Sequence, residues 1–384
     1  MIINRLIAKN WRNFREIDVH LSQRQFIVGA NASGKSNLLD IFRFLRDVVK
    51  PEGGGFQKAV KDRGGLSKIR SLAARKDPEV AIEIHLANDT DTSATWRYSL
   101  GFRREQRGHR RTLLTHERVW KNGDQLLNRP FAEDKADPDR LTQTFLEQIN
   151  VNADFREIAR FLQTVTYQHL VPQLLRYADS IQGKVIEDDP FGQGFLEKVA
   201  SVTEKSRRSR LKAIEETLKI AVPQLEQLEF IRDKITGRPH LQAIYAHWRP
   251  NAGRQREDQF SDGTLRLLGL LWTLLESESV LLLEEPELSL NAGIVSQLAS
   301  LISKMQRRRR RQVFVSTHSD ALLADQGIDG TEVLLLTPAN EGTAIEIAAD
   351  IADVKLLLEQ GLSAAEAVLS RTKPDDLARL SLLS

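Results

Sequence analysis

Hydrophobic and polar residues alternate over the first 29 residues, which is the pattern of β-strands buried on one face. The alternation predicts strands at 2–11 and 16–21, followed by a more continuously apolar strand at 25–29. Apolar residues then recur with helical spacing over 38–49, which predicts an amphipathic helix. The chain is therefore expected to open with paired strands, a buried strand and a helix.

The middle of the chain changes from strands to helices. Three further strands are expected: 80–86, 95–102 and 116–123. The last of them ends in Asn122-Gly123, the composition of a tight hairpin turn. From 139 to 225 the pattern becomes helical and heavily charged, which is typical of helices with solvated faces.

The last part of the chain alternates between strands and helices. Two strands are expected on either side of Gly237, at 228–235 and 241–248. A short polar loop, FSDGT at 260–264, then opens into a leucine-rich helix. The remaining elements are expected in this order: strand 279–285, helix 292–306, strand 311–319 and strand 332–337. This order predicts a parallel α/β core.

Composition excludes several classes of protein. The 384 residues are 41% hydrophobic, enough for a large core, and include no cysteine. Disulfides, thiol nucleophiles and cysteine-ligated metal centres are therefore excluded, and a cytoplasmic location is expected. Asn4, Arg5 and Lys9 interrupt any signal-peptide core. The longest apolar run, Leu267–Leu275, is far shorter than the roughly 20 residues that span a bilayer. No membrane association is expected, and the formal net charge of +3 permits nucleic acid without arguing for it.

Residues 29–36 read GANASGKS and fit the phosphate-binding pattern G-x-x-x-x-G-K-S between a predicted strand and a predicted helix. Gly29 and Gly34 would let backbone N–H groups wrap a phosphate. Lys35 would reach the β- and γ-oxygens, and the Ser36 hydroxyl would ligate Mg²⁺. The loop therefore predicts a bound nucleoside triphosphate; the alternative is a chance glycine-rich turn before a helix.

Two adjacent carboxylates end the apolar strand SVLLLEE, and Pro286 then stops the strand. Neighbouring residues at a strand tip can divide the chemistry of hydrolysis. Glu284 would hold the Mg²⁺ shell, and Glu285 would polarise the attacking water. The alternative, a solvated turn with scattered acids, is disfavoured after a phosphate-binding loop.

His318 follows the apolar strand VFVST. One strand–helix–strand step separates it from the paired glutamates, so its strand is expected beside theirs. That position would bring the imidazole within reach of a γ-phosphate. A purely structural histidine is the alternative.

In this order the motifs resemble an ABC-type ATPase head of the SMC/RecF/OLD-like class, closest to the compact bacterial AAA-family ATPases. GANASGKSN matches the Walker A motif, SVLLLEEPE the Walker B motif, LSLN (288–291) the D-loop and STHS (316–319) the H-loop. FSDGT takes the place of the ABC signature. The resemblance implies an α/β P-loop NTPase with an N-terminal antiparallel β-subdomain, a parallel α/β core and a helical subdomain. It implies one domain over 1–384, with 139–225 as a helical insertion and 331–384 completing the core.

The resemblance also implies a set of functional residues. Catalysis would fall to Glu285 and His318, and Ser36 and Glu284 would hold Mg²⁺. ATP would be bound by the following residues: Gly29, Asn31, Gly34, Lys35, Ser36, Asn37, Ser261 and Gly263. Ser261 and Gly263 would close over the γ-phosphate held by a partner subunit, in a dimer that forms head-to-tail on ATP.

Two features depart from the pattern of the class. Asp262 replaces the first glycine of Leu-Ser-Gly-Gly, and an acid there would repel a triphosphate unless it turned back to cap the following helix. The Q-loop glutamine could be Gln57 or Gln168, and either could be a plain surface glutamine.

The expected function is a Mg²⁺-dependent ATPase that gates a separately encoded effector, such as a nuclease, in phage defence or DNA repair. A DNA-repair ATPase that binds duplex DNA itself is the alternative, and a transporter subunit is less favoured. The segment 139–225 is too short for a coiled coil. The basic run 307–311 could contact phosphates, and a solvated basic turn is the alternative at that place between a predicted helix and a predicted strand. DTD at 89–91 resembles a metal-binding pair but is more typical of a hairpin turn, and TKPD at 372–375 is discounted.

Overall fold

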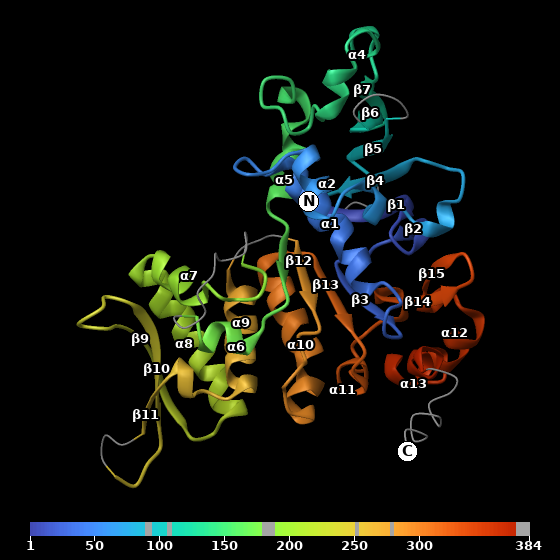
Figure 1. Cartoon of the computed structure of the whole chain (residues 1–384). Helices are drawn as coiled ribbons and strands as arrows, with labels where there is room; N and C mark the ends of the chain where they lie inside the picture. The colour runs from blue at the N-terminus through green and yellow to red at the C-terminus, as the bar shows by residue number, and fades with distance from the viewer. Residues whose placement is uncertain (89–93, 106–109, 179–188, 250–252, 277–279, 374–384) are drawn as a thin grey trace, which may run out of the picture.

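The computed structural model describes residues 1–88, 94–105, 110–178, 189–249, 253–276 and 280–373, and it contains three β-sheets (Figure 1). The first sheet is antiparallel, with the strand order β2-β1-β4-β5-β6-β7. Its strands are β1 (Ile2–Trp11), β2 (Phe14–His20), β4 (Val80–Ala87), β5 (Trp96–Arg104), β6 (Thr112–Lys121) and β7 (Asp124–Arg129). Asn122 and Gly123 join β6 to β7 with φ of 50° and 94°, so the predicted hairpin turn is confirmed.

The second sheet has the order β15-β14-β3-β13-β12-β8, in which every neighbouring pair is parallel except β14 and β15. Its strands are β3 (Arg24–Gly29), β8 (Thr166–Gln168), β12 (Leu281–Glu284), β13 (Val313–Thr317), β14 (Val333–Ala339) and β15 (Gly342–Ile347). The predicted parallel α/β core is confirmed. Strand β8 lies inside the stretch that the sequence pattern predicted to be helical.

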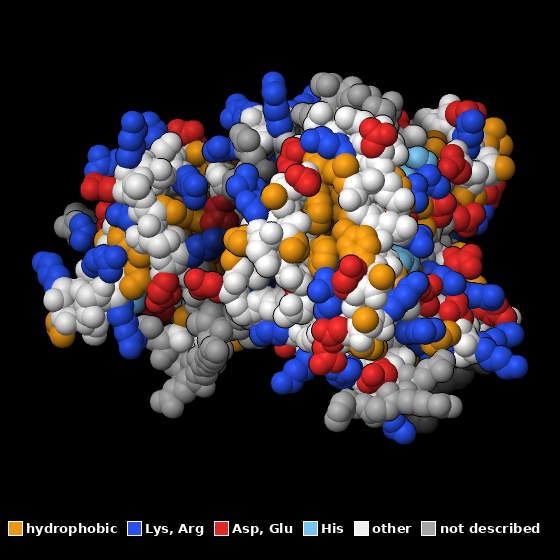
Figure 2. Space-filling model, turned by 90° about the horizontal axis from the view of Figure 1, so that it is seen from above, with side chains coloured by type: hydrophobic (Ala, Val, Ile, Leu, Met, Phe, Trp, Pro, Cys, Tyr) orange, Lys and Arg blue, Asp and Glu red, His pale blue; other side chains and the backbone are white. Residues whose placement is uncertain are grey.

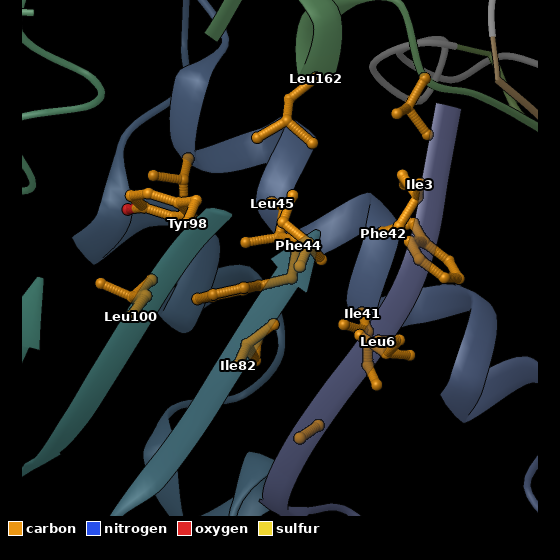
Figure 3. Packing of buried hydrophobic residues seen from close by; sticks show 14 of the residues in the cluster. Ile3, Leu6, Ile41, Phe42, Phe44, Leu45, Ile82, Tyr98, Leu100 and Leu162 are labelled. Carbon is orange, nitrogen blue, oxygen red and sulfur yellow. The ribbon is translucent and has the colours of Figure 1, made fainter. Parts of the chain in front are cut away.

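Helix α1 (Lys35–Val49) lies between the two large sheets and joins their cores. Phe42 stacks on Phe314 of β13 with ring centroids 4.9 Å apart, while Phe44 stacks on Phe102 of β5 at 5.6 Å. Figure 3 shows these α1 side chains over Ile3 and the other apolar residues of the antiparallel sheet. The phosphate-binding loop is thus anchored to a helix that is buried on both sides.

The opposite face of the parallel sheet carries a second core. Successive side chains of β3 point to opposite faces of the sheet and so enter different cores. Ile27 belongs to the first core, whereas Phe26 and Val28 belong to the second. Leucines of α9 (Asp262–Leu275) fill this second core. The other helices are α2 (Phe56–Asp62), α3 (Leu66–Ile69), α4 (Ala132–Ala136), α5 (Arg156–Gln163), α6 (Pro172–Arg176), α7 (Phe195–Ser201), α8 (Glu204–Ala221), α10 (Ala292–Arg309), α11 (Asp320–Leu323), α12 (Ala352–Glu359) and α13 (Ala364–Val368).

A third, antiparallel sheet of β9 (Leu225–Arg232), β10 (Pro239–Tyr245) and β11 (Arg254–Arg256) confirms the hairpin predicted around Gly237. The basic run 307–311 is not a uniformly solvated turn. Arg311 is 2% exposed, and its guanidinium donates to the carbonyl of Thr273 near the end of α9 at 2.9 Å. DTD at 89–91 and residues 374–375 of TKPD lie outside the described residues.

Candidate functional site

Backbone geometry explains the two glycines of the loop between β3 and α1. Gly34 caps α1 with φ 104°, and a side chain there would collide with the Asn13 amide. A Cβ on Gly29 would lie 2.7 Å from the carbonyl oxygen of Leu336 in the neighbouring strand β14. Only glycine fits at either position, which leaves the start of α1 open as an anion-binding helix terminus.

Lys35 folds back over this loop. Its Nζ donates to the carbonyls of Gly29 at 2.9 Å and Ala30 at 3.2 Å, and the residue is 8% exposed. Burial lowers the pKa of Lys35, and the charges of Glu285 and Glu284 act in the opposite direction. A buried ammonium group at a helix N-terminus is the partner that a polyphosphate requires.

Ser36 and Glu284 are brought together from opposite parts of the chain. The Ser36 hydroxyl donates to Glu284 Oε1, and Tyr167 of β8 donates its hydroxyl to Glu284 Oε2 at 2.5 Å. The sequence motifs predicted Ser36 and Glu284 as Mg²⁺ ligands but did not point to Tyr167. The tyrosine lies in a three-residue strand without an apolar run, so no local pattern pointed to it.

Glu285 and His318 also meet. Strands β12 and β13 are neighbours, as predicted, with Glu284 in register with Ser316. Glu285 adopts φ 44°, a left-handed conformation that is uncommon outside glycine. Its Oε1 lies 3.3 Å from His318 Nδ1, and both side chains are partly exposed. A carboxylate and an imidazole held side by side in this way can accept and relay a proton.

Two buried charged residues beneath this pair were absent from the sequence-predicted site. Glu287 is 7% exposed, and Thr317 donates to its Oε1 at 2.5 Å. Among the residues that the structure describes, none forms a hydrogen bond with its Oε2. Burial raises the pKa of Glu287. Arg266 of α9 is 6% exposed and donates to the backbone carbonyl of Glu285 at 3.4 Å. Helix α9 therefore contacts the glutamate pair directly.

Ser261 and Gly263 lie at the start of α9. Ser261 is the N-cap, and its hydroxyl accepts from the Thr264 N–H at 3.1 Å. Asp262 does not cap the helix, which was one way in which its charge could have been accommodated. Its carboxylate accepts from Arg176 at 2.5 Å and Gln173 at 2.7 Å, both on α6. This pairing compensates the charge of the acid in the signature position.

The predicted D-loop, 288–291, lies next to the FSDGT loop, 260–264. A Cβ on Gly263 would lie 2.8 Å from the carbonyl of Ser289, so the third signature position has no room for a side chain. Ser289 has φ 63°, and Asn291 caps α10 by accepting from the Gly293 N–H.

The remaining predicted residues have different surroundings. Asn31 is exposed at the turn of the phosphate-binding loop. The Asn37 amide donates to Asn13 Oδ1 at 2.8 Å, tying α1 to the β1–β2 turn. Gln57 donates to the carbonyls of Thr112 and Thr142 and so joins α2 to the antiparallel sheet. Gln168 is in register with Leu283, one residue before Glu284, which favours it as the Q-loop residue.

The donor set suits Mg²⁺ bound together with phosphates. Within the described ranges, no group of three or more histidine, aspartate or glutamate side chains could hold a metal alone. Ser36 and Glu284 offer hard oxygen ligands in contact with each other. Mg²⁺ in phosphate sites takes one or two protein ligands and completes its shell with phosphate oxygens and water.

A family model described as "AAA domain, putative AbiEii toxin, Type IV TA system" matches residues 26–324, from the phosphate-binding strand to beyond His318. The chain belongs to this family. The resemblance noted in the sequence is confirmed, and the chain is an ABC-type ATPase of the SMC/RecF-like class.

A curated relative, the "DNA replication and repair protein RecF" of Synechocystis sp., is 32% identical over 87 residues. The match covers 22% of this chain and 23% of the relative, so the chain spans about a quarter of that protein's length. Part of the AAA-family chain is therefore similar in sequence to RecF.

Solved structures of SMC heads share the fold. One is an SMC head bound to the C-terminal winged-helix domain of ScpA (14% identity, TM-score 0.53, covering 90% of this chain and 98% of that chain). Another is an SMC head with an extended coiled coil bound to the C-terminal domain of ScpA, derived from Pyrococcus furiosus (14% identity, TM-score 0.51, covering 94% and 99%). Among the described residues of this AAA-family chain, no helix combines the length and apolarity needed to cross a bilayer.

Proposed function

We propose that this AAA-family protein is a cytoplasmic ATPase that binds Mg²⁺-ATP at residues 29–37 and hydrolyses it. The observation that carries the proposal is the tip of β12, which places Glu284 on the Ser36 hydroxyl and Glu285 beside His318. A metal ligand and a proton acceptor are thus adjacent at the N-terminus of α1. Phosphoryl transfer needs this combination of charge stabilisation and a positioned water.

Each residue has a separate role in the proposed reaction. Lys35, with Gly29, Asn31, Gly34 and Asn37, binds the phosphates. Ser36 and Glu284 hold Mg²⁺, which supplies charge neutralisation when bound. Glu285 orients the attacking water and accepts its proton. His318, 3.3 Å from Glu285, contacts the γ-phosphate side of the site.

We further propose that two heads dimerise head-to-tail on ATP and that Ser261 and Gly263 contact the partner's nucleotide. Ser261 is exposed, whereas residues Leu265–Leu274 of α9 are buried. The loop is therefore presented outward on a rigid support. Within each head, residues 139–225 would act as the helical subdomain, and 331–384 would complete the core.

The proposed dimer gates a separately encoded effector in phage defence or DNA repair. The words "AbiEii toxin" in the family description favour defence, and the RecF relative favours repair. Direct action on duplex DNA is the second candidate, supported by the same relative. Figure 2 shows Lys and Arg interspersed with Asp and Glu over the upper face, and the net charge is only +3, so we expect weak, salt-sensitive binding.

The decisive experiment compares ATP affinity and turnover in two variants. Lys35→Ala should weaken ATP binding at least about tenfold, because the triphosphate loses its buried cation. Glu285→Gln should bind ATP normally but hydrolyse it at least roughly a hundredfold more slowly, because an amide cannot accept the proton. Calorimetry and single-turnover hydrolysis measure the two effects.

Exposed residues of α12 provide matched controls, since Lys355→Ala and Glu359→Gln make the same chemical changes far from the loop in sequence. Both controls should behave like the parent protein. Unchanged ATP affinity in Lys35→Ala would remove the phosphate-binding assignment. Parental turnover in Glu285→Gln would assign the base to another residue.

A further inference from the structure

Tyr167 is the residue that completes the surroundings of Glu284. It lies in β8, in register with Leu282 of β12, two residues before Glu284. Its hydroxyl donates to Glu284 Oε2, while the Ser36 hydroxyl donates to Oε1. The two oxygens of one carboxylate therefore have separate partners, one from β8 and one from α1.

Two sets of contacts hold the tyrosine ring in place. Tyr167 belongs to the first core and is 9% exposed. The guanidinium of Arg43, on α1, lies 4.0 Å from the ring centroid, which is a cation–π contact. Arg43 is itself 3.9 Å from the buried carboxylate of Asp40, one turn earlier on the same helix. The hydroxyl is therefore directed at Glu284 by packing that exists without nucleotide.

Tyr167 is the donor in its hydrogen bond with Glu284. A tyrosine phenol is ordinarily protonated at neutral pH, and the Tyr167 hydroxyl lies 2.5 Å from Glu284 Oε2. A phenol O–H facing a carboxylate can only donate. Donors that hold one oxygen of a metal-ligating carboxylate orient the ligand and tune its affinity.

We propose that Tyr167 is a positioning residue that holds Glu284 by Oε2 and so presents Oε1 toward Ser36 and Mg²⁺. The inference rests on the proposed Mg²⁺-ATP site. Tyr167 does not contact the substrate and acts only through the orientation of Glu284. Arg43 supports Tyr167 by covering its ring.

The test measures how nucleotide affinity depends on Mg²⁺ in Tyr167→Phe, which keeps the ring and removes only the donor. ADP is titrated by calorimetry in a series of Mg²⁺ concentrations and in EDTA. We expect the Mg²⁺ concentration for half-maximal enhancement to rise roughly tenfold. Affinity in EDTA should not change, because Tyr167 does not touch the nucleotide.

Tyr98→Phe is the matched control. Tyr98 is also buried in the first core, and its hydroxyl also donates to a carboxylate, that of Glu117, at 3.2 Å. Its removal should lower the melting temperature without moving the Mg²⁺ dependence. In a Glu284→Gln background, Tyr167→Phe should have no further effect on Mg²⁺, since the two residues act through one contact.

The outcomes separate the two proposals. A parent protein that binds ADP without any Mg²⁺ enhancement would contradict the proposed site itself. A normal parent with an unshifted Tyr167→Phe would overturn the role of Tyr167 alone, and tighter Mg²⁺ binding would show that the tyrosine withholds Glu284. If Tyr167→Phe does not fold, Arg43→Gln loosens the ring from a partly exposed position, and an unshifted Mg²⁺ dependence in that variant counts against the proposal.

Discussion

Three glutamates within four positions, Glu284, Glu285 and Glu287, have three different environments. Glu284 accepts from two hydroxyls, and Glu285 lies beside an imidazole. Glu287 is buried, and one of its oxygens has no hydrogen-bond partner within the described part of the chain. The sequence distinguished the first two because they end an apolar strand. It did not distinguish Glu287, because its burial under α9 depends on a helix that precedes it in the chain.

The environment of Glu287 leads to a prediction about pH. Because burial raises its pKa, the folded state binds this proton more tightly than the unfolded state. The contribution of Glu287 to the stability of the parent should therefore decline as pH rises above the ordinary glutamate range of about 4. Glu287→Gln should remove this contribution and raise the free energy of unfolding at pH 7, relative to the parent, by about 1 kcal/mol, since Thr317 can still donate to the amide oxygen.

Urea unfolding at pH 4, 5.5 and 7 checks this expectation. Glu359→Gln, on an exposed helix face, is the control for loss of one negative charge. The result that contradicts this expectation is a difference in free energy of unfolding between Glu287→Gln and the parent that stays the same at all three pH values. Glu287 would then be ionised in the folded protein, with its charge balanced by Arg266.

Among the elements, α9 connects the FSDGT loop to Glu285, the proposed catalytic base. Its N-cap is Ser261, its second turn carries Arg266 against the Glu285 carbonyl, and its last carbonyls accept from Arg311. Capping, burial and a cation at the C-terminus all stabilise this helix. These contacts fix the helix from whose N-terminus the loop extends.

Two substitutions at Ser261 separate capping from function. Ser261→Ala removes the acceptor for the Thr264 N–H and should lower stability by about 1 kcal/mol. Ser261→Asp keeps a good cap, so its stability should match the parent, but its carboxylate would face the partner's γ-phosphate. We therefore expect Ser261→Asp to fold normally and to lose ATPase activity, measured at saturating ATP. Parental activity in this variant would argue that the loop has no phosphate to contact.

Elements with a strong local pattern were predictable from the sequence. Strands β1 to β6, α1 and the parallel core follow from alternation, helical spacing and turn chemistry. Strand β8 was not predictable, because three residues carry no period and its pairing with β12 spans more than a hundred positions. The partners of the Asp262 side chain were not predictable for a similar reason, since Arg176 and Gln173 come from α6, far earlier in the chain.

For the whole molecule, the central question is whether one ATP is shared by two chains. Suppose that each ATP lies between the Lys35 loop of one head and Ser261–Gly263 of the other. Lys35→Ala and Ser261→Asp should then each be inactive as homodimers. A mixed dimer collects both lesions in one site and leaves the other site with an intact Lys35 and an intact Ser261. Mixing two inactive proteins should restore ATPase activity, up to about half per mixed dimer if the sites are independent.

The double variant Lys35→Ala/Ser261→Asp, mixed with the parent protein, tests the opposite arrangement. In these mixed dimers the two lesions fall in different sites, so both sites carry one lesion and activity should be lost. Subunit exchange is followed independently with fluorescently labelled heads, and Lys355→Ala mixed with the parent is the control. If exchange occurs and the parent's activity is undiminished, Ser261 acts on its own subunit or on no nucleotide. If the first mixture stays inactive while the second loses activity, the sites are shared but must fire together, because one intact site then has no independent turnover.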